Sequence, residues 1–179
     1  MNFVGMDKLS LLDYEDKVSV VLFCKPCNFR CPFCHNGTSV LESDSEIEFS
    51  YIFSYLKKRS GVIDAVVLSG GEVTLMPNLK EIIKEIKSLN LLVKIDTNGT
   101  NPEIIKELID EHLIDYVAMD IKNSKDKYSL TTNASINYFD SVLKTYNLLK
   151  SSNIPFELRT TLVKEFHSLT DIISIGQSF

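Results

Sequence analysis

The sequence predicts an α/β fold in which about five successive strand–helix units build a parallel sheet. Short apolar runs rich in β-branched residues alternate along the 179-residue chain with apolar residues at helical spacing. Continuous apolar strands of this kind are typical of parallel sheets that helices cover. No repeat, linker or low-complexity segment divides the chain, so we expect one domain over 1–179.

Five apolar segments are predicted to be the strands: 17–24, 62–71, 91–99, 115–122 and 155–164. The unusual polar residues of the chain fall where these strands end, and sites in parallel α/β folds are built at that edge. Periodicity leaves open whether such a sheet stays flat or curls into part of a barrel.

Helices are predicted between the strands from apolar spacing and from cap residues. Proline is well placed at a helix start because its missing N–H is not needed there. The signals are the segment 46–61, which ends at Gly61, Pro77 as the start of a second helix, Asn101 and Pro102 as the cap and first residue of a third, a segment of about 135–152, and a last helix from Ser168.

Composition argues against two classes of partner. The formal net charge is -5, so the bulk charge does not suggest a protein that binds nucleic acid or a membrane surface. The first 17 residues contain acids where a signal peptide would need an apolar segment, and no run approaches transmembrane length. We therefore expect a soluble, cytoplasmic protein.

All four cysteines lie close together, at Cys24, Cys27, Cys31 and Cys34. In a reducing cytoplasm, such a cluster favours metal binding or redox chemistry over disulfides. Zinc sites usually separate two C-x2-C pairs by a long loop, whereas only three residues separate the pairs here. Iron–sulfur clusters are held by closely spaced thiolates, and C-x3-C-x2-C could hold three corners and leave one iron open. A closed site with Cys24 as a fourth ligand, binding zinc or carrying electrons, stays an alternative.

The segment Cys27-Asn-Phe-Arg-Cys31-Pro-Phe-Cys34 matches the C-x3-C-x2-C signature of the radical S-adenosylmethionine (SAM) superfamily. Together with CHN, SGGEVTL, DTNG and MDIK, it resembles the branch that activates glycyl-radical enzymes. More narrowly, KLSLLDYEDKVSVVLF followed by CNFRCPFCHN is similar to the activating proteins of anaerobic ribonucleoside-triphosphate reductases. The resemblance covers about residues 8–165 and implies a partial (β/α) barrel.

By this resemblance, Cys27, Cys31 and Cys34 bind a [4Fe-4S] cluster whose open iron takes the amino and carboxylate groups of SAM. No catalytic residue beyond the cluster and SAM is implied. The implied SAM contacts are Phe33, Cys34 and His35 for the adenine, Gly70, Gly71 and Glu72 near the methionyl amino group, Asp96 and Thr97, which in some relatives also hold a monovalent cation, Asp120 and Lys122 for the carboxylate, and Arg159.

The same resemblance implies the chemistry and the partners. The reduced cluster passes an electron to SAM, and the resulting 5′-deoxyadenosyl radical takes a hydrogen from the Cα of a glycine in a partner enzyme. The implied partner is an anaerobic ribonucleotide reductase, and the implied electron donor is a flavodoxin or a ferredoxin. A radical SAM enzyme that acts on a small molecule, of the deazaguanine-forming type, is the alternative within the superfamily.

Several positions depart from the pattern of these relatives. Val73 follows GGE where they have proline, and Pro26 precedes the first cluster cysteine where they often have glycine. Compared with these relatives, we expect the chain to lack about one strand and one helix of the six-unit core. We expect Cys24 to be a bystander, and we expect no site role for His112 or His167.

Overall fold

The computed structural model describes residues 3–37 and 46–179. Its sheet has six strands in the order β1-β2-β3-β4-β5-β6, and all neighbouring pairs from β2 onward are parallel. This confirms the predicted parallel α/β class, and all five predicted strands are present. The strands are β1 Phe3–Ser10, β2 Ser19–Cys24, β3 Ala65–Gly70, β4 Leu92–Thr97, β5 Tyr116–Asp120 and β6 Phe156–Arg159.

The first strand was missed by the sequence analysis. β1 runs antiparallel to β2, and its register shifts twice along the pair. Three consecutive exposed residues interrupt its buried pattern, so neither an alternation nor an apolar run is visible in the sequence. The predicted fifth strand was too long, because β6 ends at Arg159 and the chain then leaves the sheet.

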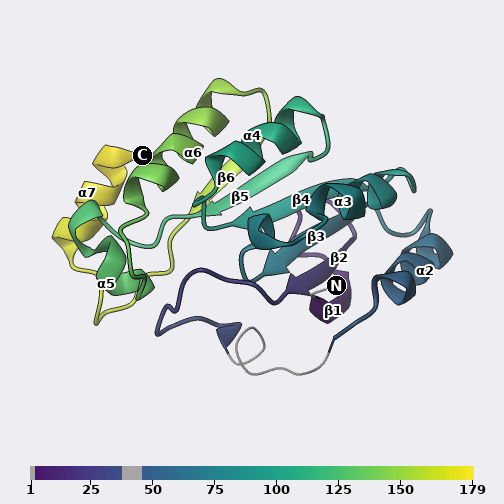
Figure 1. Ribbon diagram of the computed structural model, residues 1–179, viewed down its shortest axis with the longest axis horizontal. Coiled ribbons are helices and arrows are strands. Elements are labelled where there is room, and N and C mark those ends of the chain that lie inside the picture. The colour runs from purple at the N-terminus through teal and green to yellow at the C-terminus, as the bar shows by residue number, and fades with distance from the viewer. Residues whose placement is uncertain (1–2, 38–45) are drawn as a thin grey trace.

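The helices cover one side of the sheet, with α3, α4 and α6 lying together there in Figure 1. Pro102 is the first residue of its helix, as predicted, whereas Pro77 precedes a left-handed Asn78 and the helix begins only at Leu79. The α-helices are α2 Phe49–Arg59, α3 Leu79–Lys87, α4 Pro102–Asp110, α5 Tyr128–Thr132, α6 Phe139–Ser151 and α7 Leu169–Ser178; two short 3-10 helices span Val73–Leu75 and Lys125–Lys127.

Strand alternation divides the sheet into an apolar face and a mixed face. In β2, Val20, Leu22 and Cys24 belong to the large core under the helices, whereas Val21 belongs to a small cluster on the opposite face. Each fully buried aliphatic side chain of the large core stabilises the fold by about 1.5–3 kcal/mol. The helices are therefore held on one face, and the other face is left for polar groups.

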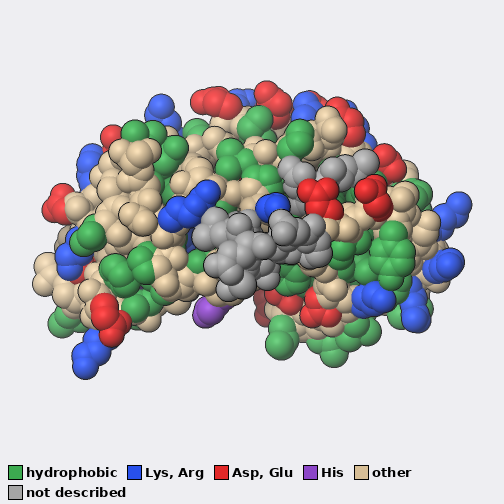
Figure 2. Space-filling model, turned by 60° about the horizontal axis from the view of Figure 1, so that its bottom comes forward, with side chains coloured by type: hydrophobic (Ala, Val, Ile, Leu, Met, Phe, Trp, Pro, Cys, Tyr) green, Lys and Arg blue, Asp and Glu red, His purple; other side chains and the backbone are tan. Residues whose placement is uncertain are grey.

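Two observations concern membranes and nucleic acids. In the part of the chain that the structure describes, no helix is long and apolar enough to cross a bilayer. On the face shown in Figure 2, basic and acidic side chains are interspersed rather than gathered by sign.

Candidate active site

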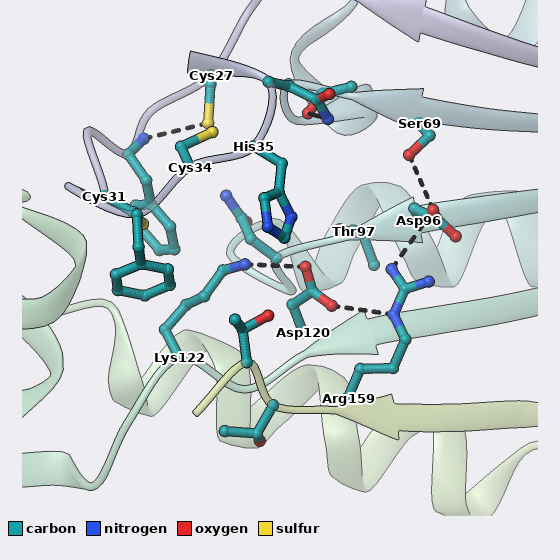
Figure 3. A pocket seen from close by; sticks show the side chains of 18 residues that line it. Cys27, Cys31, Cys34, His35, Ser69, Asp96, Thr97, Asp120, Lys122 and Arg159 are labelled. Carbon is teal, nitrogen blue, oxygen red and sulfur yellow. Dashed lines mark hydrogen bonds and ion pairs between the residues drawn. The ribbon is translucent and has the colours of Figure 1, made fainter. Parts of the chain in front are cut away.

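A cavity of about 320 Å³ opens at the carboxyl ends of the parallel strands. Figure 3 shows side chains from the cysteine loop and from β3 to β6 converging on it. Every predicted site residue except Glu72 lines this cavity. The lining residues are Cys27, Phe29, Cys31, Phe33, Cys34, His35, Asn36, Ser69, Gly70, Gly71, Asp96, Thr97, Asn98, Asp120, Lys122, Arg159, Thr160 and Thr161.

The cysteine loop follows β2 and divides the four thiols three to one. Cys27, Cys31 and Cys34 line the cavity, whereas Cys24 is 0 % exposed and packs in the core under the helices. Because side chains alternate along a strand, Cys24 shares the face of Leu22 rather than the polar face. Four thiols therefore do not converge on one point, and the geometry does not favour a four-cysteine site.

Three thiols around one cavity fit a sulfur-ligated cluster better than a single metal ion. Among the described residues, no three His, Cys, Asp or Glu side chains are arranged to hold one ion. Burial raises the pKa of Cys27, and it raises the pKa of Cys31 to about 11 although the Lys122 ammonium opposes this. Soft thiolates are the ligands of iron–sulfur clusters, and a bound metal overrides such a shift by taking the deprotonated form.

The paired glycines are required by the close approach of the end of β2 and of the cysteine loop that follows it. Gly70 has a φ of +101°, and a Cβ there would lie 2.6 Å from the Cys24 nitrogen. A Cβ on Gly71 would lie 2.1 Å from the Pro26 oxygen. The Gly71 N–H donates over 2.8 Å to the carbonyl of Cys24, the last residue of β2, and the Glu72 N–H donates over 2.5 Å to the carbonyl of Pro26 in the cysteine loop. These contacts explain the glycines without reference to a bound ligand.

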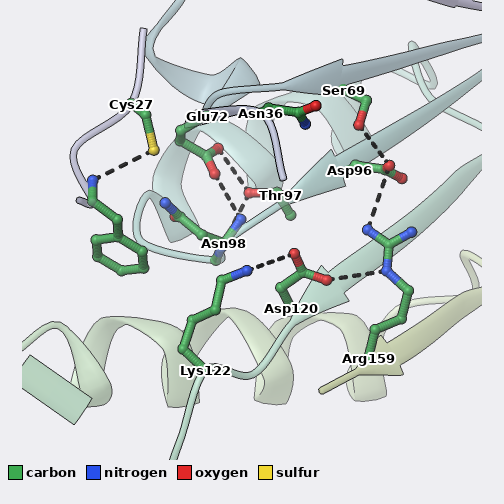
Figure 4. Close-up of polar contacts among 12 residues, drawn as sticks. Cys27, Asn36, Ser69, Glu72, Asp96, Thr97, Asn98, Asp120, Lys122 and Arg159 are labelled. Atoms are coloured by element: carbon green, nitrogen blue, oxygen red, sulfur yellow. Dashed lines mark hydrogen bonds and ion pairs between the residues drawn. The ribbon is translucent and has the colours of Figure 1, made fainter. Parts of the chain in front are cut away.

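Glu72 was expected beside SAM, but it does not line the cavity. Its carboxylate is 0 % exposed and accepts hydrogen bonds from the Thr97 hydroxyl at 2.8 Å and the Asn98 main-chain nitrogen at 2.6 Å. It also accepts from the nitrogen and the hydroxyl of Thr74 at 3.1 and 2.5 Å. Burial raises the pKa of Glu72 in spite of these bonds. Figure 4 shows the carboxylate joining the loops after β3 and β4, which makes Glu72 a positioning residue.

A chain of ion pairs crosses the mixed face of the sheet, which lies opposite the helices. Arg159 lies between two carboxylates, with Nε 3.0 Å from Asp120 Oδ1 and NH2 3.4 Å from Asp96 Oδ2. In the ladders, Ala118 pairs with Asp96 on one side and with Glu157 on the other. Figure 4 shows the side chain of Arg159, on β6, reaching toward Asp120 on β5 and Asp96 on β4.

The pKa values of Asp96 and Asp120 are shifted in opposite directions. Burial raises the pKa of Asp96, and it outweighs the Arg159 charge and the hydrogen bond from Ser69 at 2.8 Å. For Asp120, burial acts in the same direction, but Lys122 and Arg159 outweigh it and the pKa is lowered. The Asp96 Oδ1 atom is buried and has no hydrogen-bond partner among the described residues. It is an open acceptor at the wall of the cavity.

Lys122 meets Asp120 in a different way from the one expected. The sequence analysis placed both in one strand, but β5 ends at Asp120 and Lys122 lies two residues beyond it. The Lys122 Nζ atom still lies 2.8 Å from Asp120 Oδ2. Burial favours the neutral amine, but the Asp120 charge outweighs it and raises the pKa of Lys122. The lysine is therefore a cation at the mouth of the cavity.

The segment after β6 brings residues to the site that the sequence analysis missed. Phe33, between the last two cysteines, has its ring 5.6 Å from that of Phe166 and 6.5 Å from that of His167. His167 Nδ1 lies 3.1 Å from the Val163 main-chain nitrogen, and Nε2 lies 2.9 Å from the Lys122 carbonyl oxygen. Contrary to expectation, His167 therefore contributes to the site, because it holds the main chain at Lys122 and packs beside Phe33.

The other missed residues differ in the signal that they carried. Ser69, Asn36 and Asn98 lie inside the quoted motifs SGGEVTL, CHN and DTNG, so reading these motifs residue by residue would have found them. Thr160 and Thr161 carried no signal, because they lie in a segment that was predicted to be strand. His112 takes a left-handed φ of 52° after α4 and does not line the cavity, in agreement with the expectation.

Comparison with known proteins places this site in a family. The radical SAM superfamily matches residues 21–167. A Methanocaldococcus jannaschii protein that is named a glycyl-radical enzyme activating enzyme is 39 % identical over 178 residues, which are 97 % of this chain and 73 % of that protein. The pyruvate formate-lyase-activating enzyme of Clostridium pasteurianum is 32 % identical over 149 residues, which are 78 % of this chain and 60 % of that enzyme.

Solved structures agree on the fold. Streptococcus suis SuiB bound to S-adenosylmethionine superposes with a TM-score of 0.64 at 15 % identity, over 86 % of this chain and 35 % of that one. This chain thus spans about a third of SuiB and three fifths of the Clostridium enzyme. The chain belongs to the radical SAM superfamily and is an enzyme of that class, whose cofactors are a [4Fe-4S] cluster and SAM.

Proposed function

We propose that this protein generates a glycyl radical on a partner enzyme, and that the partner is an anaerobic ribonucleoside-triphosphate reductase. The observation that carries the proposal is the convergence of Cys27, Cys31 and Cys34 on one cavity beside a lysine–carboxylate pair. The likeness over 97 % of this chain to a protein named a glycyl-radical enzyme activating enzyme supports the activating role. The similarity of CNFRCPFCHN to reductase activating proteins is the basis for the choice of partner.

In this proposal, the three cavity cysteines hold the cluster and the surrounding strand ends hold SAM. When bound, the reduced cluster and SAM supply a 5′-deoxyadenosyl radical that removes hydrogen from the glycine Cα. Phe33, Cys34 and His35 flank the adenine, and Gly70 and Gly71 present main-chain groups to the methionyl end. The protein itself has to bind and orient the cluster and SAM, and it has to exclude water from the site.

The charged residues of the site divide this work. The Lys122 ammonium, held by Asp120, would pair with the SAM carboxylate. The attraction between a cation and an anion is stronger in a site that excludes water than in bulk solvent. Thr97 is fixed by Glu72 at the end of β4. The open Oδ1 of Asp96 is an acceptor for a monovalent cation or for a SAM donor, and Arg159 holds the other oxygen of this carboxylate.

The proposal includes the environment and the electron donor. A flavodoxin- or ferredoxin-type protein in the cytoplasm would reduce the cluster, and neither a nucleic acid nor a membrane is required as a partner. Three free cavity thiols and a sulfur cluster favour a reducing compartment.

Anaerobic reconstitution with iron and sulfide tests the proposal in two stages. First, the spectrum of the reduced protein should change when SAM is added, and 5′-deoxyadenosine should appear under reductant. If neither occurs, the radical SAM activity is wrong. Second, incubation with an anaerobic ribonucleotide reductase should produce a glycyl radical signal, with pyruvate formate-lyase as the comparison. A glycyl radical signal only with pyruvate formate-lyase, or turnover only of a small-molecule substrate of the deazaguanine-forming type, would overturn the choice of partner.

A further inference from the structure

The three residues between Cys27 and Cys31 contact two different parts of the fold, α5 and the loop that follows β4. The Arg30 main-chain nitrogen donates to the Thr132 carbonyl of α5 at 2.9 Å. The ring of Phe29 lies 6.2 Å from that of Tyr128. Asn28 turns instead toward the loop that follows β4, and it makes contacts that neither the cysteine signature nor the family match explains.

Asn28 closes a ring of hydrogen bonds with two residues of that loop. Its Nδ2 donates to the Thr100 hydroxyl at 2.9 Å, and that hydroxyl donates to Asn98 Oδ1 at 2.8 Å. The Asn98 Nδ2 then donates to Asn28 Oδ1 at 2.8 Å, which returns to the starting residue. Each group is both donor and acceptor, and bonds that run in one direction around a ring polarise one another. The Thr100 main-chain nitrogen also donates to Asn98 Oδ1 at 3.1 Å, which fixes the orientation of the Asn98 amide and with it the direction of the ring.

The ring joins the cluster loop to both strand ends on the SAM side of the cavity. The Asn98 main-chain nitrogen donates to Glu72 at 2.6 Å, and Glu72 follows the paired glycines of β3 directly. Asn98 also follows Asp96 and Thr97 of β4. Asn98 and Thr100 are 7 % and 5 % exposed, so water does not compete well for these bonds. The loop that carries the thiols is in this way fixed relative to the residues that face SAM.

We propose that the Asn28–Asn98–Thr100 ring is a positioning device that sets the cluster loop at the correct distance and angle from the SAM site. This inference rests on the proposed cluster and SAM binding by this cavity. Asn28 and Thr100 do not line the cavity, so they act through the loop rather than by touching either cofactor. Loss of the ring leaves the three thiols able to hold a cluster but loosens its alignment with SAM. Small misplacements of reacting groups are costly in such sites.

The test uses Asn28→Ala and Thr100→Val, which open the ring from opposite sides, and Thr100→Ser, which keeps the hydroxyl as a matched control. Each variant is reconstituted anaerobically, and its iron and sulfide content and its thermal unfolding are compared with those of the wild type. The reduced cluster is then titrated with SAM while its paramagnetic resonance spectrum is recorded. This spectrum reports how SAM lies against the cluster, and it can be recorded without enzymatic turnover.

We expect wild-type iron content in all variants. Asn28→Ala and Thr100→Val should need about tenfold more SAM to reach the wild-type spectral change, because one lost ring of hydrogen bonds corresponds to roughly one decade in affinity. Thr100→Ser should titrate like the wild type. The double variant should be no worse than either single one, because both changes open the same ring.

Three results would overturn the proposal. Wild-type SAM titration in both opened variants would show that alignment does not depend on the ring. A loss in Thr100→Ser as large as that in Thr100→Val would assign the effect to side-chain packing at position 100 and not to the ring, because serine keeps the hydroxyl. Loss of the cluster from folded Asn28→Ala protein would mean that the ring holds the loop together rather than aligning it. If instead the wild type shows no spectral change with SAM, the proposed function itself has failed.

Discussion

The Lys122 ammonium lies 2.8 Å from the Asp120 carboxylate across the end of β5, where the strand has already finished. Both side chains are less than a third exposed, so the pair is shielded from water and from salt screening. Removal of the lysine would leave a partly buried carboxylate facing Arg159 alone.

We therefore predict that Lys122→Met lowers the free energy of unfolding by about 1–3 kcal/mol, because one partner of a partly buried pair is left behind. It should also weaken SAM binding by at least about tenfold. Urea unfolding and SAM titration of the reconstituted protein measure the two effects. Lys125→Met is the matched control, since the Lys125–Asp140 pair is exposed and should contribute no more than about 0.5 kcal/mol. Equal losses in both variants would contradict a special role of Lys122.

The cysteines should respond to substitution according to the face on which they lie. Cys24→Ser is expected to retain the iron content of the wild type, because Cys24 lies outside the cavity. It should still cost about 1–3 kcal/mol of unfolding free energy, since a hydroxyl replaces a thiol in an apolar core. Cys31→Ser should lose most of the cluster. Iron and sulfide analysis of the reconstituted variants checks this, and loss of the cluster in Cys24→Ser would invalidate the three-to-one division.

Gly71 offers a prediction about the crossing of the cysteine loop. A Cβ there would lie 2.1 Å from the Pro26 oxygen, which is main chain and cannot turn away. Gly71→Ala should therefore displace the loop and lower the free energy of unfolding by more than about 2 kcal/mol. Gly176→Ala is the control, because a Cβ at that helical position meets nothing within 4 Å. It should stabilise the protein by about 0.5–1 kcal/mol through helix propensity. Thermal unfolding of both variants decides between these expectations.

The Asp171 carboxylate should make the stability of the protein depend on pH in the acid range. Its carboxylate accepts from Lys127 Nζ at 2.6 Å and from the Ser168 main-chain nitrogen at 2.8 Å, in a capping box at the start of α7. The bond from Lys127, followed by those from Ser168, lowers the pKa of Asp171. A carboxyl group with a lowered pKa contributes stability that is complete above its unfolded value, about 3.9, and is lost as the pH falls through the folded value.

Asp171→Asn should therefore be less stable than the wild type at pH 7, and the difference should shrink as the pH falls below about 4. Urea midpoints of both proteins over this range measure the difference. A gap that stays constant down to pH 3 would mean that Asp171 acts through its shape and not through its charge.

Much of the fold could be predicted because its signals are local. Five strands and five helices were found from apolar runs and spacing, and Pro102 was correctly placed as a helix start. β1 was missed because its buried pattern is broken by exposed residues, and α5 because no apolar periodicity marks it. Pro77 was misplaced because the left-handed Asn78 comes between it and the helix.

The site residues show the same division more sharply. The motifs were recognisable because each is a short segment at a strand end, and parallel strands bring their carboxyl ends to one edge. The thiol spacing and the order of the motifs by themselves determined the radical SAM superfamily. Of the residues chosen from these motifs, all except Glu72 line the cavity.

Only the tertiary structure decided what these residues contact. Glu72 turned out to join two loops, His167 to support Lys122, and the glycines to admit the cysteine loop, because each contact depends on where another segment passes. The partners of Asn28 lie 70 and 72 residues away, at a separation that no local pattern encodes. Sequence spacing determines which side chains share a strand end, whereas packing between strand ends determines which of them touch.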